Sequence, residues 1–201
     1  MSSEYDPFLP GTKADVDNSN LETVRDLFLE ASMPYLSSPL LWFTWALILP
    51  GAALGTPFIA GRFGWLGVLL LWSLSILFGG VFEISSIRSG VEAGGSTPLS
   101  SWAFGVQANL SMIAIAFSLF LLWQQSAWAL PALWLLVLGH SFVSLGGLSF
   151  NGLRQTGLLY QLGGVVALWP SGRPLLVLAL TTFIANVWMG FSVSRRSARL
   201  E

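Results

Sequence analysis

Long apolar runs alternate with short polar breaks along most of the chain. Six runs are distinct, at 39–60, 65–84, 101–123, 128–148, 153–169 and 174–193. Most of them have roughly the 20 residues that a helix needs to cross a hydrocarbon core about 30 Å thick. The fifth run is the shortest and carries Arg154, Gln155 and Gln161. The pattern predicts an all-α, polytopic membrane protein built as a bundle of about six transmembrane helices.

The breaks between the runs predict how the helices are connected. Short turns join the first and second runs, the third and fourth, and the last two, and such turns make consecutive helices antiparallel neighbours. The longer break at 85–100 is rich in glycine and is predicted to be a loop. Gly51 and Gly55 form a GxxxG pair in the first run, which favours close helix packing, with a conduit wall or a subunit contact as the alternatives.

The segment before the first run differs in character from the rest. Residues 1–18 are polar and are predicted to form a disordered cytoplasmic tail. A capping box opens the next segment, 19–34, whose apolar positions share one helical face. This segment is predicted to be a short amphipathic juxtamembrane helix, with an ordinary surface helix as the alternative. The chain then divides into the six-helix transmembrane domain, 35–194, and a basic cytoplasmic C-terminus, 195–201.

Charge supports a lipid environment and predicts an orientation. Only 9% of the residues are charged, whereas soluble domains carry about 25%. Six spans leave both termini on one side, which collects seven of the nine Lys and Arg residues. The positive-inside rule therefore predicts a multi-pass protein of the cytoplasmic (inner) membrane with both termini in the cytoplasm. The chain has no basic patch, so a nucleic-acid partner is not expected.

A few polar side chains interrupt the apolar runs, and polar groups in lipid usually turn inward. Gln107, Asn109 and Asn186 are amides that suit a small polar solute, although they equally suit bonds between helices. Glu83 and His140 are predicted to form a proton relay, because both side chains can exchange protons near neutral pH. The alternatives are an interfacial pairing of Glu83 and a helix–helix hydrogen bond from His140.

Enzyme signatures are missing from the sequence. One His and no Cys cannot supply the standard ligands of a zinc site, and neither a metal nor a cofactor is expected. The chain also lacks a G-x-S-x-G nucleophile motif, an H-E-x-x-H motif and a P-loop. We therefore predict that the protein is not an enzyme.

Several local motifs resemble the acetate uptake transporter family. Gly79-Gly80-Val81-Phe82-Glu83 is followed by Gly94-Gly95-Ser96-Thr97 at nearly the family's spacing, and Pro39-Leu40 matches part of its first-helix motif. Glu83 occupies a position where the family has an amide. The resemblance covers the span count and about 65 residues of pattern.

The resemblance implies a small six-helix bundle that assembles as a hexamer and moves acetate, succinate or similar metabolites. It also implies a conduit lined by Phe43, Gln107, Asn109 and Asn186. The leading hypothesis is thus a transporter or channel for a small solute such as a short-chain carboxylate, coupled to protons through Glu83 and His140. The alternative is a non-catalytic accessory or structural subunit of a larger membrane complex.

Overall fold

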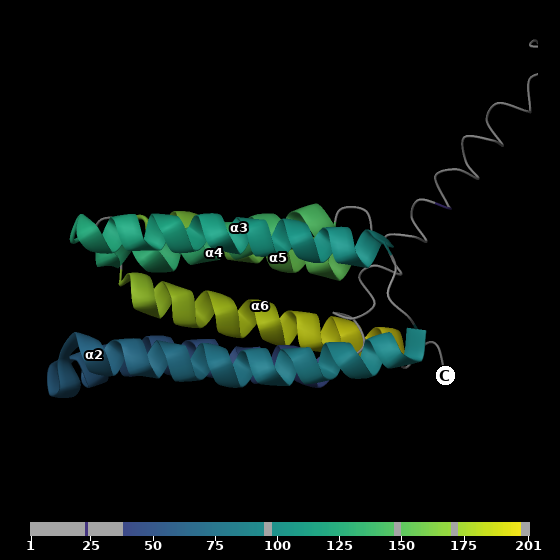
Figure 1. Ribbon diagram of the computed structural model, residues 1–201, viewed down its shortest axis with the longest axis horizontal. Coiled ribbons are helices and arrows are strands. Elements are labelled where there is room, and N and C mark those ends of the chain that lie inside the picture. Colours follow the sequence, from purple (N-terminus) through teal and green to yellow (C-terminus); the bar gives the residue numbers. More distant parts are fainter. Residues whose placement is uncertain (1–22, 24–37, 95–97, 147–149, 170–172, 198–201) are drawn as a thin grey trace, which may run out of the picture.

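The computed structural model of the protein describes residue 23 and residues 38–94, 98–146, 150–169 and 173–197. This part of the chain is helical, with short connections and no β-strand (Figure 1), which confirms the predicted all-α class for it. The predicted tail, 1–18, the predicted amphipathic helix, 19–34 apart from Thr23, and the last four residues lie outside the described residues. The elements are α2 (Pro39–Gly94), α3 (Pro98–Trp123), the 3-10 turn η1 (Ala127–Ala129), α4 (Leu130–Gly146), α5 (Asn151–Ala167) and α6 (Pro174–Ser197).

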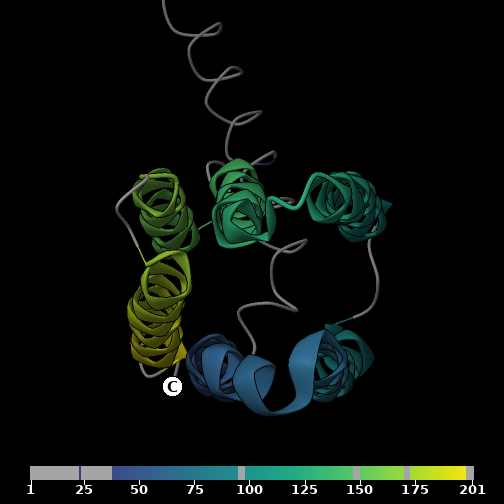
Figure 2. The same cartoon turned by 90° about the vertical axis from the view of Figure 1, so that its left-hand side faces the viewer.

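The first element, α2, is a hairpin of two helical arms that meet at Gly64. The backbone leaves the helical conformation at this residue, with φ 65° and ψ −162°. Contacts between the arms are antiparallel: Gly55 lies against Leu71, and Trp45 packs on Gly79 farther from the turn. Figure 2 looks along the helices and shows the dark blue and teal arms joined by this turn.

A shared hydrogen-bonding arrangement joins the arms of α2 and also joins α3 to α4. In α2, the indole N–H of Trp72 donates to the hydroxyl of Thr56 at 3.0 Å. That hydroxyl donates in turn to the carbonyl of Ala52 in its own helix at 2.7 Å. Between α3 and α4, the indole of Trp134 donates to the hydroxyl of Ser118 at 3.1 Å. Each indole therefore has an acceptor on the neighbouring helix, which a buried N–H requires.

Gly64→Ala is expected to destabilise the α2 hairpin by about 1–3 kcal/mol, because its φ and ψ lie in a region that residues with a Cβ rarely adopt. Gly61→Ala is the matched control. Both positions have open space where a Cβ would stand, but only Gly64 has a positive φ. Thermal unfolding in detergent measures the difference, and equal melting temperatures for the two variants would contradict a turn that depends on glycine.

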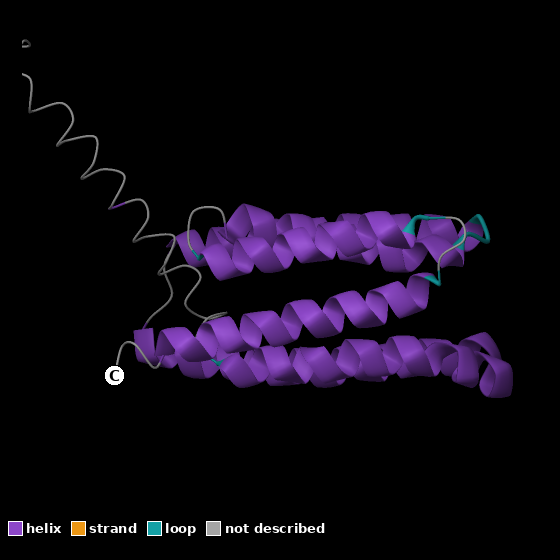
Figure 3. Ribbon diagram, turned by 180° about the vertical axis from the view of Figure 1, so that it is seen from behind, coloured by secondary structure: helices purple, strands orange, loops and turns teal. Residues whose placement is uncertain are grey.

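The helices pack in a simple order: α6 lies between α2 and α5, α5 packs against α4, and α4 packs against α3. Figure 2 shows this order end-on, and Figure 3 shows from behind that the helices run lengthwise. The turn of α2 and the start of α6 lie at one end of the bundle (Figure 1, left), whereas α6 finishes at the other end.

Helices α4 and α5 approach closely because glycines face each other. A Cβ added to Gly157 of α5 would lie 2.6 Å from the backbone nitrogen of Val143 and 2.7 Å from the carbonyl oxygen of Gly139 on α4. Glycine at such positions lets two helix backbones meet in lipid. Gly51, by contrast, is exposed with no atom within 4 Å of a Cβ. At Gly55 an added Cβ would lie 3.7 Å from Leu71, an ordinary contact distance, so neither glycine of the predicted GxxxG pair makes a close backbone approach within the described chain.

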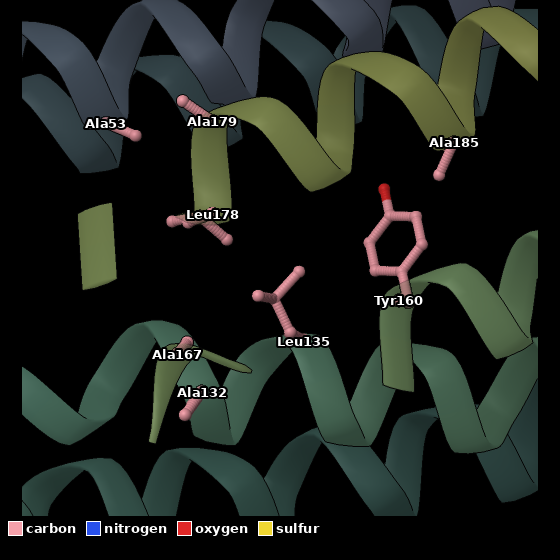
Figure 4. Close-up of a cluster of buried hydrophobic side chains, with 8 residues drawn as sticks. All are labelled: Ala53, Ala132, Leu135, Tyr160, Ala167, Leu178, Ala179 and Ala185. Carbon is pink, nitrogen blue, oxygen red and sulfur yellow. The ribbon is translucent and has the colours of Figure 1, made fainter. Parts of the chain in front are cut away.

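The apolar core lies where α4, α5, α6 and the first arm of α2 meet. Leu135, Tyr160 and Leu178 project into this space (Figure 4). Alanines from the same four segments close the space around them and let the helices come near. A second buried cluster joins the same elements and contains Trp42, Leu153, Met189 and Val193.

Four described segments are long and apolar enough to cross a membrane, as expected for a membrane protein. They are Pro39–Ser86, which includes both arms of α2, Gly105–Trp123, Ala127–Gly146 and Pro174–Arg196. Large apolar side chains such as Leu47, Phe78 and Phe117 are exposed on them, which suits contact with acyl chains. Helix α5, which coincides with the fifth apolar run, is not among these four segments.

Two helices extend beyond their predicted ends. The second arm of α2 continues to Gly94 through most of the predicted loop at 85–100, so that prediction is wrong for the described residues. Isolated glycines are tolerated inside a helix, and the next proline, Pro98, comes only at the start of α3. Helix α6 ends at Ser197, so the predicted basic C-terminus, 195–201, begins as its last turn.

Candidate functional site

Asn186 forms a buried polar contact between α6 and α5. Its side chain is 1% exposed, and its Oδ1 accepts a hydrogen bond from the hydroxyl of Tyr160 at 3.2 Å. Tyr160 is itself buried, and Figure 4 shows its hydroxyl pointing from α5 towards α6. Burying an amide and a phenol in apolar surroundings costs free energy unless they bond each other. The pair therefore favours one register of α5 against α6.

Two buried polar atoms of α5 and α6 have no hydrogen-bond partner among the described residues: Nδ2 of Asn186 and Oγ1 of Thr156. Thr156 is fully buried one helical turn before Tyr160, so both side chains share a face of α5. Thr182 of α6 is equally buried, but its hydroxyl donates to the carbonyl of Leu178 at 2.8 Å. We name Thr156, Tyr160 and Asn186 the α5–α6 polar cluster.

Aromatic rings border this cluster on the side of α4 and α2. Tyr160 packs edge-to-face on Phe142 of α4, with 5.5 Å between the ring centroids. Phe142 packs in the same manner on Trp42 of α2 at 5.6 Å. Such apolar surroundings strengthen a hydrogen bond that is made and raise the cost of one that is not.

Gln107 and Asn109 of α3, the amides that the sequence predicted to suit a solute, are not members of the cluster. The Oε1 of Gln107 accepts a hydrogen bond from the hydroxyl of Ser141, a buried residue of α4. Gln107 thus makes the helix–helix bond that the sequence left open as an alternative. Asn109, two residues farther along α3, is exposed.

Phe43 also lies apart from the cluster, at the contact of α2 with α6. Its ring packs edge-to-face on Phe191 at 5.4 Å between centroids. It also covers Gly190, where an added Cβ would lie 2.8 Å from the ring. Of the four residues that the family resemblance implies as a conduit lining, Asn186 alone belongs to the α5–α6 polar cluster.

Glu83 and His140, the predicted proton relay, lie in different surroundings. The carboxylate of Glu83 accepts a hydrogen bond from the indole of Trp45, whose ring packs on Gly79 one turn earlier in the same arm. Glu83 therefore links the two arms of α2. His140 is exposed on α4, and no hydrogen bond or ion pair joins it to Glu83 in the part of the chain that the structure describes.

Thr156 and Tyr160 are the members of the cluster that the sequence analysis did not select. The available signal was spacing: Thr156 and Tyr160 are four residues apart, on a stripe that continues to Gly163 and is buried along α5. A threonine in an apolar helix often bonds its own backbone, so its residue type alone gives no reason to select it. The described residues contain no group of three His, Cys, Asp or Glu that could hold a metal ion.

No protein-family model matches this chain, and neither curated proteins nor solved structures show a significant similarity to it. The resemblance to the acetate uptake transporters thus stays a prediction from the sequence.

Proposed function

We propose that the chain crosses the membrane six times, with each arm of α2 and each of α3 to α6 as one span. Helix α5 is short for a span, since its 17 residues cover about 26 Å at 1.5 Å per residue. The proposal that α5 crosses is supported by its position between α4 and α6, because the segment formed by η1 and α4 and the segment of α6 are both long enough to cross. Its exposed Arg154 and Gln155 lie near its first turn, where they would reach the headgroups.

The distribution of arginines supports the orientation that we propose, with both termini in the cytoplasm. Arg88, Arg154, Arg195 and Arg196 belong to the end of the bundle where α6 finishes. Arg62 and Arg173 belong to the end that holds the α2 turn. The excess of positive charge at the first end favours the cytoplasmic side for it, that of the inner membrane in a bacterial cell.

We further propose that this membrane protein passes a small polar solute. The observation that carries this proposal is the α5–α6 polar cluster, which places unpartnered polar atoms inside an otherwise apolar bundle. Polar groups at membrane depth are costly, and in transport proteins they commonly mark a solute path. A bundle with only a structural role gains nothing from leaving Thr156 and Asn186 unpaired.

Flux into liposomes that contain the purified protein tests the solute proposal. The panel comprises water, urea, glycerol, acetate and succinate, and protein-free liposomes supply the background. At least one solute should enter faster than this background. Equal rates for the whole panel would reject the proposal.

Proton coupling through Glu83 and His140 is not part of the proposed mechanism. The carboxylate of Glu83 accepts a hydrogen bond from the indole of Trp45, and His140 lies on an exposed face of α4. No hydrogen bond or ion pair joins either residue to the α5–α6 polar cluster among the described residues. The proposed solute path therefore includes neither group.

A non-catalytic accessory role within a larger membrane complex is the second candidate, and α3 supports it. Helix α3 packs on α4 and η1, and Met112, Phe117 and Phe120 are exposed along it. Such a face suits either lipid or the helix of another subunit. Purification in mild detergent separates the cases: a stoichiometric foreign partner supports the accessory role, whereas a homo-oligomer or a monomer favours transport.

A further inference from the structure

We propose that the α5–α6 polar cluster binds one uncharged molecule that both donates and accepts hydrogen bonds, and that it rejects ions. The claim about binding stands on the unpartnered atoms of Thr156 and Asn186. Its extension to the transported solute rests on the proposed function. Together they define the solute as neutral, in contrast to the carboxylate anion that the family resemblance implies.

The free hydrogen-bonding capacity of the cluster defines what binds there. Asn186 uses its Oδ1 to accept from Tyr160, and both N–H groups of its Nδ2 are free. The hydroxyl of Thr156 is free to donate and to accept, and the oxygen of Tyr160 retains a lone pair. A molecule that accepts from Asn186 and donates to Thr156 or Tyr160 satisfies the site, as water, an alcohol or an amide does.

The packing of α5 on α6 places Thr156 on the face of α5 that meets α6. Leu153 shares a buried cluster with Met189 on α6, and Gly163 lies against Thr181 of the same helix. Thr156 lies between Leu153 and Gly163 on this stripe of α5, and it therefore faces α6 one turn from the Tyr160–Asn186 bond.

The charge around the cluster excludes an ion. All three of its side chains are neutral, and no described contact joins them to a charged group. Arg195 is the nearest cation along α6, nine residues from Asn186, about 13 Å of helix. The next, Arg196, has its guanidinium over the ring of Phe150, with 5.6 Å to the centroid. An ion beside Asn186 would lose its hydration without gaining a counter-charge, which is unfavourable at membrane depth.

Thr156→Val and Thr182→Val form a matched pair for the test. Both threonines are fully buried, but Thr156 has a free hydroxyl whereas Thr182 bonds its own backbone. In water-edited solid-state NMR of the labelled protein in bilayers, magnetisation from water should reach the Nδ2 of Asn186. Thr156→Val should reduce this transfer, and Thr182→Val should leave it as in the wild type. Absence of transfer in the wild type would overturn the binding claim.

Two transport measurements test the claim that the transported solute is neutral. Urea influx into proteoliposomes should exceed the protein-free background and fall about tenfold in Thr156→Val, the effect of losing roughly one hydrogen bond, but not in Thr182→Val. Planar bilayers in potassium acetate should carry no current that depends on Asn186. Such a current would overturn the claim of a neutral solute while the transport proposal stands. A water signal at Asn186 without flux of any solute would support the binding claim and reject transport.

Discussion

Gly157→Ala should destabilise the protein by about 3 kcal/mol, at the upper end of what overpacking usually costs. The added methyl group would lie 2.6 Å from the backbone nitrogen of Val143 and 2.7 Å from the carbonyl oxygen of Gly139. Both atoms belong to the backbone of α4, so no side chain can rotate to make room. Helix α4 must move away from α5 as a unit, and it loses contacts along its length.

Gly51→Ala is the control for this variant. The substitution is the same and also lies within a helix, but nothing stands within 4 Å of the new Cβ. Its stability should equal that of the wild type or exceed it by up to about 1 kcal/mol. Unfolding of the purified protein in mixed micelles, titrated with a denaturing detergent, gives both values. Equal stability of the two variants would contradict the close approach of α4 and α5.

Asn186→Leu should reduce solute flux more than tenfold, because it removes the amide at the centre of the α5–α6 polar cluster. Leucine has the same number and branching of side-chain heavy atoms as asparagine, so it is the apolar residue closest in shape, but the site loses the N–H groups that would hold a solute. Loss of such a donor from a buried polar site commonly costs more than an order of magnitude in selectivity or rate. Asn109→Leu, the same change at an exposed position of α3, should leave flux near the wild-type value.

A double variant separates loss of function from misfolding. Asn186→Leu alone leaves the hydroxyl of Tyr160 buried without a partner, which costs about 1–3 kcal/mol. Adding Tyr160→Phe removes that hydroxyl, and replacing both partners of a buried bond is nearly neutral for stability. The double variant should therefore be as stable as the wild type and still fail to pass the solute. Full flux through the double variant would show that the cluster is not part of the transport path.

Hydropathy predicted most of the helical framework because burial in lipid selects long apolar runs, whatever their neighbours. It did not predict which side of each helix faces the bundle. Asn109 and Asn186 have the same side chain in similar apolar runs, yet Asn109 is exposed and Asn186 is buried. That difference follows from contacts between helices distant in the chain, which a single sequence does not specify.

The glycine positions show the same limit: spacing along the chain does not predict which residues meet between helices. The GxxxG spacing drew attention to Gly51, but the close approach is made by Gly139 and Gly157, which lie 18 residues apart on two helices. Only the register of α4 against α5 brings these two together. The end of α2 was mispredicted because the glycines of a polar break indicated a loop, although isolated glycines are tolerated inside a helix and no proline follows before Pro98.

Single-cysteine labelling tests the six-span arrangement most directly. The chain has no cysteine, so each introduced thiol is the only one present. In right-side-out membrane vesicles, a membrane-impermeant maleimide should label Gly61→Cys, Ser126→Cys and Trp169→Cys from outside. Asn151→Cys and Ser194→Cys should be labelled only after the membrane is permeabilised. Labelling of Asn151→Cys and Trp169→Cys from the same side would contradict the account, because α5 would then not cross the bilayer.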